Sequence, residues 1–263
     1  MSRRSVVSRR KTDGENVCRK DEMLMRRLVI EEAFWNLFPS SVIAVAVARN
    51  VDNRWLSRKG EVPSLPELLQ EATARAEERF RDVELAGHAA VAPWREAYKR
   101  FGAPKGNRSS IEALLRRVKN GKPLPSINPL VDLYNMVSLS FALPCGGEDL
   151  DVSSGDVRLT LARGDELFVP LGSETNEPPL PGEVVYADDE GILCRCWNWR
   201  EAERTKLTEA TRNALLCIEG VDDSFALSVA EAMEELAEQV RCRLGGEVRT
   251  ALLRRENPFF DLE

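Results

Sequence analysis

The chain has 263 residues, with 37 Lys and Arg against 43 Asp and Glu, and a formal net charge of −6. No apolar run approaches the roughly 20 residues of a membrane-spanning helix, so we expect a soluble protein that does not enter a membrane. The negative charge argues against indiscriminate nucleic-acid binding, and no DNA partner is expected. Six scattered cysteines without a Cys-x-x-Cys pair, and one histidine, His88, predict no metal site. Reduced thiols suit a cytoplasmic protein.

The predicted elements begin after a basic, polar stretch. Residues 1–22 show no hydrophobic periodicity, and we expect a disordered extension ahead of a single domain over residues 23–263. Residues 41–48 (SVIAVAVA) form a continuous apolar and β-branched run, which predicts a buried strand.

Four helices with recognisable starts follow this strand. Capping boxes predict helices over residues 64–80 and 109–120, because a Ser and a Glu three residues later satisfy the first backbone N–H groups. A short helix is expected over residues 93–101, where Gly102 ends it. The Asn-Pro start of residues 128–141 predicts a fourth helix, since Asn is a favoured cap and Pro a favoured first residue.

Beyond Pro144 the pattern changes to short β-branched and apolar runs, separated by Gly, Pro and Asp. We expect strands over residues 156–162, 166–170, 183–188 and 191–197. A long helix follows over about 223–244, with apolar residues at spacings of three and four. The predicted fold class is therefore α+β, with a mixed or antiparallel sheet and helices packed on it.

One candidate pocket lies around the fourth helix and the segment after it. The helix carries Asp132, Tyr134 and Asn135 beside its apolar stripe, and these residues either complete the core or line a pocket. Gly146 and Gly147 let the backbone approach another strand or a ligand closely. Further along, the alternation of Trp197 and Trp199 predicts that both face the same side of a strand.

Positive charge gathers between residues 95 and 122, where nine Lys and Arg stand against two Glu. The basic residues are Arg95, Lys99, Arg100, Lys105, Arg108, Arg116, Arg117, Lys119 and Lys122. This cluster is either a solvated helix face or a surface that holds a phosphate backbone.

Five segments stand in the order of a known family. They are NPLVDLYN (128–135), LPCGGEDLD (143–151), GDVRLTLARGDELFVPLG (155–172), PGEVVYADDEG (181–191) and TEATRNALLCIEG (208–220). In this order they resemble the B3/B4 domain, the editing domain of the phenylalanyl-tRNA synthetase beta subunit. The resemblance covers roughly residues 95–220, and YKRFG and WNWRE are more similar to the stand-alone members.

The resemblance implies hydrolysis of the ester that joins a wrong amino acid to the terminal ribose of a tRNA. An aminoacyl ester is already activated, so positioning a water molecule suffices without a metal, a cofactor or a covalent nucleophile. The expected partner is the acceptor end of a mischarged tRNA. Its phosphates are expected to meet Lys105, Arg108, Arg116 and Arg117.

The resemblance also suggests the site residues. Tyr134 stands where the family has a Thr, and Gly146 where it has a His, so tyrosine is a doubtful substrate. The family's pocket glutamate aligns with Cys217 or Glu219, and Glu219 is preferred. Some stand-alone relatives remove canavanine, an arginine analogue, from arginine tRNA, and a guanidinium-like group suits a carboxylate beside an aromatic face. We therefore expect Tyr134 and Glu219 to be catalytic, with a pocket of Asn128, Asn135, Gly146, Gly147 and Trp199.

Two other interpretations stay open at this point. The chain could be a tRNA- or RNA-binding module without catalysis, which the missing histidine favours, or a protein that binds a free amino acid. The oligomeric state is not predicted.

Overall fold

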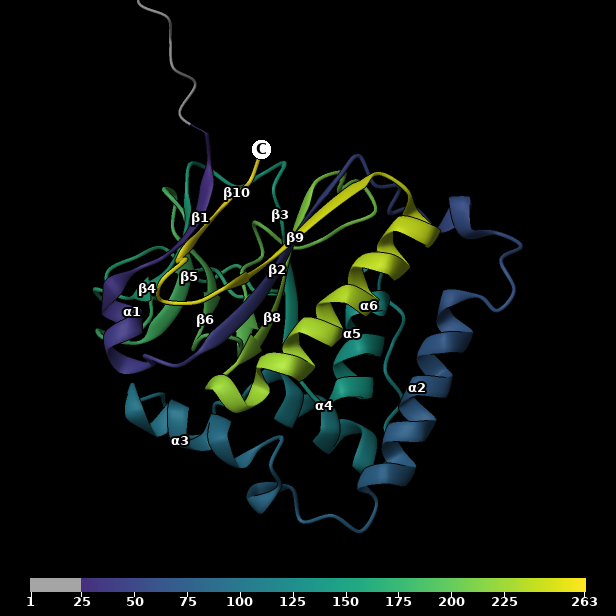
Figure 1. Cartoon of the computed structure of the whole chain (residues 1–263), viewed down its shortest axis with the longest axis horizontal. Helices are drawn as coiled ribbons and strands as arrows, with labels where there is room; N and C mark the ends of the chain where they lie inside the picture. The colour runs from purple at the N-terminus through teal and green to yellow at the C-terminus, as the bar shows by residue number, and fades with distance from the viewer. Residues whose placement is uncertain (1–24) are drawn as a thin grey trace, which may run out of the picture.

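The structure is a computed structural model that describes residues 25–263, and the predicted extension over 1–22 lies outside the described residues. Figure 1 shows the strands gathered on one side of the molecule and the helices α2, α5 and α6 on the other. The elements are β1 (Arg27–Ile30), α1 (Glu32–Leu37), β2 (Val42–Arg49), α2 (Leu65–Phe80), α3 (Ala92–Arg100), α4 (Ser110–Lys119), α5 (Pro129–Phe141), β3 (Cys145–Asp149), β4 (Val157–Leu161), β5 (Val184–Ala187), β6 (Ile192–Arg195), β7 (Arg200–Glu201), β8 (Ala214–Gly220), α6 (Ala226–Leu244), β9 (Glu247–Leu253) and β10 (Phe259–Asp261).

The described strands form two sheets, not the single sheet expected. One has the order β10-β1-β4-β5-β6-β7. It is a mixed sheet, because β1 and β4 are parallel and every other neighbouring pair in it is antiparallel. The other has the order β3-β8-β2-β9 and is antiparallel throughout. The predicted α+β class with mixed and antiparallel pairing is confirmed.

Strand β2 shows how the two cores are built on one sheet. Its side chains alternate between the two faces of the sheet, as they do in any strand. Ile43, Val45 and Val47 belong to the core shared with the six-stranded sheet. The residues that alternate with these three, from Val42 to Ala48, point to the opposite face and belong to a second core with α5 and α6. Both faces are covered, which explains the unbroken apolar run in this part of the sequence.

The predicted helices agree closely with the observed ones, and Asn128 caps α5 by accepting a hydrogen bond from the N–H of Val131. The strand expected over 166–170 is wrong: only Pro170 forms an isolated bridge, with Ala202. The Phe168 N–H instead donates to the Asn176 side chain, and its carbonyl accepts from Glu177. A nearby loop thus satisfies the Phe168 backbone, while the Leu167 and Val169 carbonyls accept from the N–H groups of Ile192 and Glu203.

Candidate functional site

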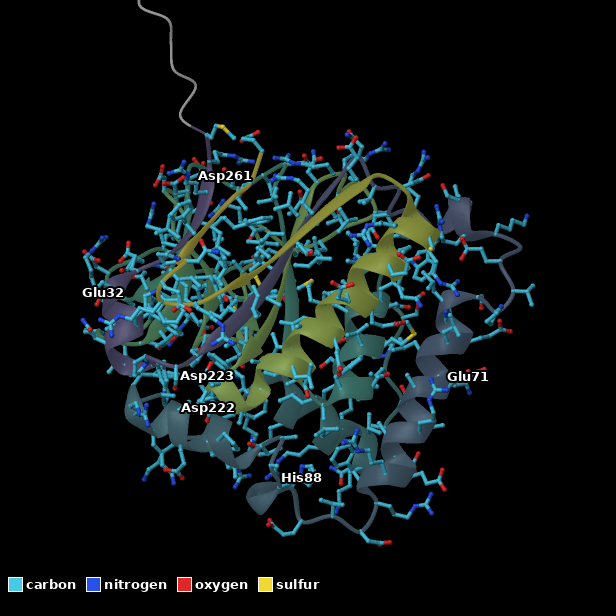
Figure 2. The ribbon with its side chains drawn as sticks, viewed as in Figure 1. Glu32, Glu71, His88, Asp222, Asp223 and Asp261 are labelled. Carbon is cyan, nitrogen blue, oxygen red and sulfur yellow. The ribbon has the colours of Figure 1, made fainter. Side chains whose placement is uncertain are left out.

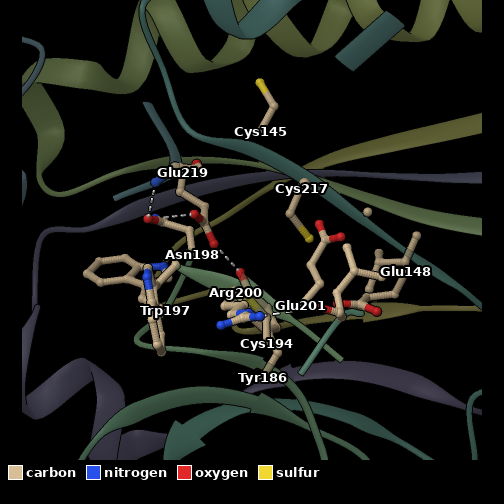
Figure 3. Close-up of a pocket in the computed structure, with 16 residues that line it drawn as sticks. Cys145, Glu148, Tyr186, Cys194, Trp197, Asn198, Arg200, Glu201, Cys217 and Glu219 are labelled. Atoms are coloured by element: carbon tan, nitrogen blue, oxygen red, sulfur yellow. Dashed lines mark hydrogen bonds between the residues drawn. The ribbon is translucent and has the colours of Figure 1, made fainter. Parts of the chain in front are cut away.

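A cavity of about 260 Å³ lies between the two sheets. Strands β3 and β8 form one wall, because Gly146 pairs with Cys217 and Glu148 with Leu215, and residues opposite each other share a face. On the facing sheet, Cys194 of β6 pairs with both Tyr186 of β5 and Glu201 of β7. Figure 3 shows side chains from both walls turned toward the same space.

Glu219 is a residue of β8, and two side chains from the six-stranded sheet fix its carboxyl. One lies on β5 and the other on the loop between β6 and β7. The Tyr186 hydroxyl donates to Oε1 at 2.7 Å, and the Asn198 amide donates to Oε2 at 2.6 Å. Glu219 as a whole residue is only 3% exposed. Burial raises the pKa of Glu219 to about 7, even though both hydrogen bonds favour the charged form. The group therefore changes its charge near neutral pH.

Two further carboxyls, Glu148 and Glu201, line the cavity away from Glu219 (Figure 3). Burial and the nearby Glu201 carboxylate raise the pKa of Glu148 well above its usual range. Burial likewise raises the pKa of Glu201 to about 7, although the Gly147 N–H lowers it. The cavity is therefore lined by acidic side chains, and part of these carboxyl groups carry a proton near neutral pH.

Three cysteines also line the cavity: Cys145, Cys194 and Cys217. Burial is the largest cause that raises the pKa of each thiol well above its usual range. Since the thiolate is the nucleophilic form, these side chains stay protonated and unreactive at neutral pH.

A second hollow, the basic groove, adjoins the cavity at Trp199, which lines both. The residues of the groove are Gly106, Arg108, Ala113, Arg116, Arg117, Asn120, Lys122 and Trp199. Ser110, at the start of α4, lines the cavity, and its buried hydroxyl oxygen has no hydrogen-bond partner among the described residues. A ligand that enters the cavity past Trp199 thus passes a cationic surface.

Part of the groove's charge is already neutralised within the protein. The buried Glu112 carboxyl pairs with Arg116 at 2.8 Å and with Arg108 at 3.4 Å, and also with Arg95 at 2.7 Å. Arg117 is exposed and donates to the carbonyl of Pro123. Lys105 lines a neighbouring hollow that shares Arg108 with the groove.

The structure brings together part of the predicted site. Glu219, Gly146, Gly147 and Trp199 all line the cavity. Arg108, Arg116 and Arg117 line the adjoining groove, and Lys105 lies one hollow further away.

Three predicted residues on or next to α5 lie outside the cavity. Tyr134 is 8% exposed and packs in the core between the four-stranded sheet, α5 and α6. Asn128 is committed to structure: its amide donates to the Leu207 carbonyl, and its oxygen accepts from the Asn53 side chain. Asn135 is half-buried and is not among the residues that line the cavity.

The strand expected to carry Trp197 and Trp199 ends before both of them, at Arg195. Cys196 and Trp197 have φ values of 47° and 68°, so the chain turns there. Both tryptophans nevertheless line the cavity: Trp197 is fully buried and also packs on Phe34, and Trp199 is half-buried.

Sequence reasoning missed Tyr186, Asn198, Glu148 and Glu201 as site residues. Tyr186 and Asn198 carry no local signal, since their roles depend on the second sheet meeting β8. Glu148 did carry a local signal in the sequence. It stands two residues after Gly146 in a predicted pocket segment, and residues two apart share one face of a strand.

His88, the single histidine, lies on the loop before α3 and outside the residues that line the cavity and the groove (Figure 2). Its Nδ1 accepts from the Ala90 N–H, and its ring packs on Phe80. Within residues 25–263, no cluster of three or more His, Cys, Asp or Glu is placed to hold a metal ion. No helix in the same range is both long and apolar enough to cross a membrane.

Comparison with known proteins places these residues within one family. A family model described as the B3/4 domain matches residues 93–243, more than half of the chain. The phenylalanine–tRNA ligase beta subunit of Psychrobacter arcticus is 34% identical over 94 residues, which are 35% of this chain and 11% of that protein. The chain thus spans a small part of that relative's length.

A solved structure also resembles this chain. It is an N-terminal fragment of the phenylalanyl-tRNA synthetase beta subunit from Pyrococcus horikoshii, with a TM-score of 0.43 and 15% sequence identity. The match covers 84% of this chain and 50% of that chain.

Proposed function

Because this chain belongs to the B3/4 domain family, we propose that it is an aminoacyl-tRNA deacylase that hydrolyses the ester of a mischarged tRNA in trans. One observation carries the proposal: the buried Glu219 carboxyl, which titrates near neutral pH, lies in a cavity that adjoins a basic groove. A carboxylate of this kind suits general-base catalysis, which is most effective when the pKa of the base lies near the working pH.

In the proposed reaction, ionised Glu219 accepts a proton from a water molecule as the water oxygen bonds to the ester carbonyl carbon. When the ester bond breaks, the proton passes from Glu219 to the departing ribose oxygen, which leaves a free amino acid and an intact tRNA. Tyr186 and Asn198 orient the carboxylate through their hydrogen bonds. The unpartnered Ser110 hydroxyl is available to the ester or to the ribose. No thiolate is required, in keeping with the raised pKa values of the cysteines.

The basic groove supports the choice of tRNA as the partner. Arg108, Arg116 and Arg117 would contact the phosphates of the acceptor end, with Lys105 further along the same surface. Phosphate contacts of this kind position a nucleic acid without reading its sequence. With a tRNA substrate, we expect the protein to act in the cytoplasm, in the quality control of translation.

The acidic cavity supports a cationic amino acid as the group removed. Glu148, Glu201 and Glu219 form no ion pair with a Lys or Arg among the described residues. A guanidinium-like side chain would supply the missing charge. We therefore propose canavanyl-tRNA for arginine as the substrate, in place of the tyrosyl ester.

The test is a deacylation time course with canavanyl-tRNA and arginyl-tRNA for arginine, and with tyrosyl-tRNA for phenylalanine. We expect rapid loss of the canavanyl ester. The Glu219→Gln variant keeps the size of the side chain but not the base, so its rate should fall about 10²- to 10⁴-fold. Glu234→Gln, on the exposed face of α6, is the matched control and should leave the rate unchanged.

Other outcomes would favour the alternative functions. If all three esters stay at their spontaneous rates while tRNA binds, the chain is a tRNA-binding module without catalysis. If free canavanine or arginine stabilises the protein and tRNA does not bind, it is an amino-acid-binding protein. Loss of the tyrosyl ester alone would keep the deacylase and contradict the proposed substrate.

A further inference from the structure

Glu148 and Glu201 come from different sheets and meet in the cavity. Glu148 lies on β3 of the four-stranded sheet, and Glu201 lies on β7 of the six-stranded sheet. Gly146 of β3 lies beside Glu201, since an added Cβ on Gly146 would be 3.5 Å from Oε1 of Glu201, an ordinary contact distance. The Gly147 N–H also favours the charged form of Glu201 by hydrogen bonding. Figure 3 shows the two carboxyls on the side of the cavity opposite Glu219.

Three other buried acids of the described chain are paired with arginines, whereas neither Glu148 nor Glu201 is. Glu112 pairs with Arg95 and Arg116, Glu183 with Arg195, and Asp188 with Arg204, all at 2.6 to 2.8 Å. Glu148 is 7% exposed, and its Oε2 atom has no hydrogen-bond partner among the described residues. The Thr205 hydroxyl favours the charged form of Glu148, but no Lys or Arg among the described residues pairs with it. A cation from outside the chain would therefore stabilise the ionised carboxyl.

The cations nearest to the pair are engaged elsewhere. Arg204 lowers the pKa of Glu148 from a distance, but its guanidinium contacts Asp188 at 2.6 Å and Glu190 at 3.6 Å. Arg200 lines the cavity, yet its side chain is exposed and donates to the Leu171 carbonyl. Neither of these arginines forms an ion pair with Glu148 or Glu201.

Glu219 is less suited to bind a cation, because both of its oxygens already accept hydrogen bonds, one from Tyr186 and one from Asn198. It also lies at the end of the cavity nearest the groove, since the Ser110 N–H donates to the Asn198 carbonyl and Asn198 precedes Trp199. The ribose and the ester would arrive at this end. The amino-acid side chain would then extend toward Glu148 and Glu201.

We infer that Glu148 and Glu201 form the subsite for a guanidinium-like side chain and determine which amino acid is removed. The inference rests on the proposed deacylase function and adds the residues that select its substrate. A planar guanidinium presents N–H groups along several edges, so it can donate to two carboxylates at once. A neutral side chain would leave both carboxyls buried and unpaired, and sites of this kind reject such ligands strongly.

The test compares canavanyl-tRNA for arginine with citrullyl-tRNA for arginine, whose side chain is neutral and similar in size. Wild type should prefer the canavanyl ester. Glu148→Gln and Glu201→Gln should each lower kcat/KM for the canavanyl ester about 10- to 100-fold, mainly through KM, because each removes one charged hydrogen-bond acceptor. Their kcat/KM for the citrullyl ester should stay the same or rise. Glu219→Gln should instead lower kcat for both esters and leave the preference intact.

Two outcomes separate this inference from the proposed function. If wild type hydrolyses none of the esters, the deacylase proposal fails. If wild type hydrolyses them and both Gln variants keep the wild-type preference for a cation, the inference alone is overturned. Calorimetric binding of an amide-linked canavanyl-adenosine, which is not hydrolysed, gives a readout without turnover. Binding at least tenfold weaker in both variants than in Glu234→Gln supports the subsite, and equal binding contradicts it.

Discussion

Glu219 differs from the paired acids of this chain because its hydrogen bonds come from neutral groups. Arg95 and Arg116 hold the pKa of Glu112 below its usual value, and Arg195 does the same for Glu183, although burial opposes both. Tyr186 and Asn198 offset the burial of Glu219 only in part, and its pKa rises to about 7. Neutral donors orient a carboxylate without fixing its charge, which is what a base that gains and loses a proton requires.

The pH dependence of deacylation should therefore report the titration of Glu219. As the ionised form is the base, the single-turnover rate should rise through pH 7 and level off above it, once spontaneous hydrolysis is subtracted. In Tyr186→Phe one hydrogen bond to the carboxylate is lost, so the charged form is less favoured. The midpoint should move to higher pH by about one unit.

Glu234→Gln serves as the control for this measurement and should keep the wild-type midpoint. An unchanged midpoint in Tyr186→Phe, or a rate that falls as pH rises through 7, would contradict the role of Glu219 as the base.

At the scale of single elements, periodicity predicted which residues share a face, but not what that face meets. The sequence placed Tyr134 beside the apolar stripe of α5 and left open whether it lines a pocket, and in the structure it packs into the core between α5, α6 and the four-stranded sheet. Conversely, the period of two in β8 places Leu215, Cys217 and Glu219 on one face, and that face lines the cavity. An aromatic residue with a polar tip suits a core and a pocket equally, so local pattern does not decide between them.

Helix α4 presents one strip to the basic groove and another to the core. Ala113, Arg116, Arg117 and Asn120 follow the spacing of neighbours on one helix face, and all line the groove. Replacement of Arg117 by Ala should weaken binding of uncharged arginine tRNA several-fold. The slope of log affinity against log salt concentration should decrease in magnitude by about 0.7 to 0.9, the value for one lost phosphate contact.

The salt series needs a basic residue outside the groove for comparison. Arg241→Ala on α6 removes an exposed arginine that pairs with Glu238 at 3.5 Å, and it should leave both the affinity and the slope unchanged. Arg116→Ala should weaken binding less than Arg117→Ala, because Glu112 already neutralises part of its charge. Equal slopes in Arg117→Ala and Arg241→Ala would remove the groove from the tRNA interface.

At the scale of the whole molecule, the sequence predicted the elements well and the cavity poorly. Caps and periodicity are local, so helices such as α2 and α4 could be placed within a residue or two. The cavity arises only where two sheets face each other, and it joins Glu219 to Tyr186, 33 residues away, and to Asn198, 21 residues away. No local sequence pattern predicts that these two sheets face each other. The division of the strands into two sheets was missed for the same reason.

The cavity should also impose a pH dependence on the stability of the whole fold. Folding raises the pKa values of Glu148, Glu201 and Glu219, so the native state binds more protons than the unfolded chain above the ordinary glutamate pKa. The free energy of unfolding must then fall as pH rises from about 5 toward 8. Acids whose pKa values are lowered, such as Glu112 and Glu183, lose their contribution only in more acidic solution and do not affect this window.

Glu148→Gln tests this dependence, because it removes a carboxyl that is buried without an arginine partner. At pH 5 the variant and wild type should unfold at similar urea concentrations, since native Glu148 is protonated there. At pH 8 the variant should be more stable than wild type, because only wild type has to keep a proton on Glu148 or bury its charge. The exposed Glu234→Gln should match wild type at both pH values. A variant less stable than wild type at pH 8 would mean that Glu148 stabilises the fold, and that the acidic cavity is structural rather than held open for a cation.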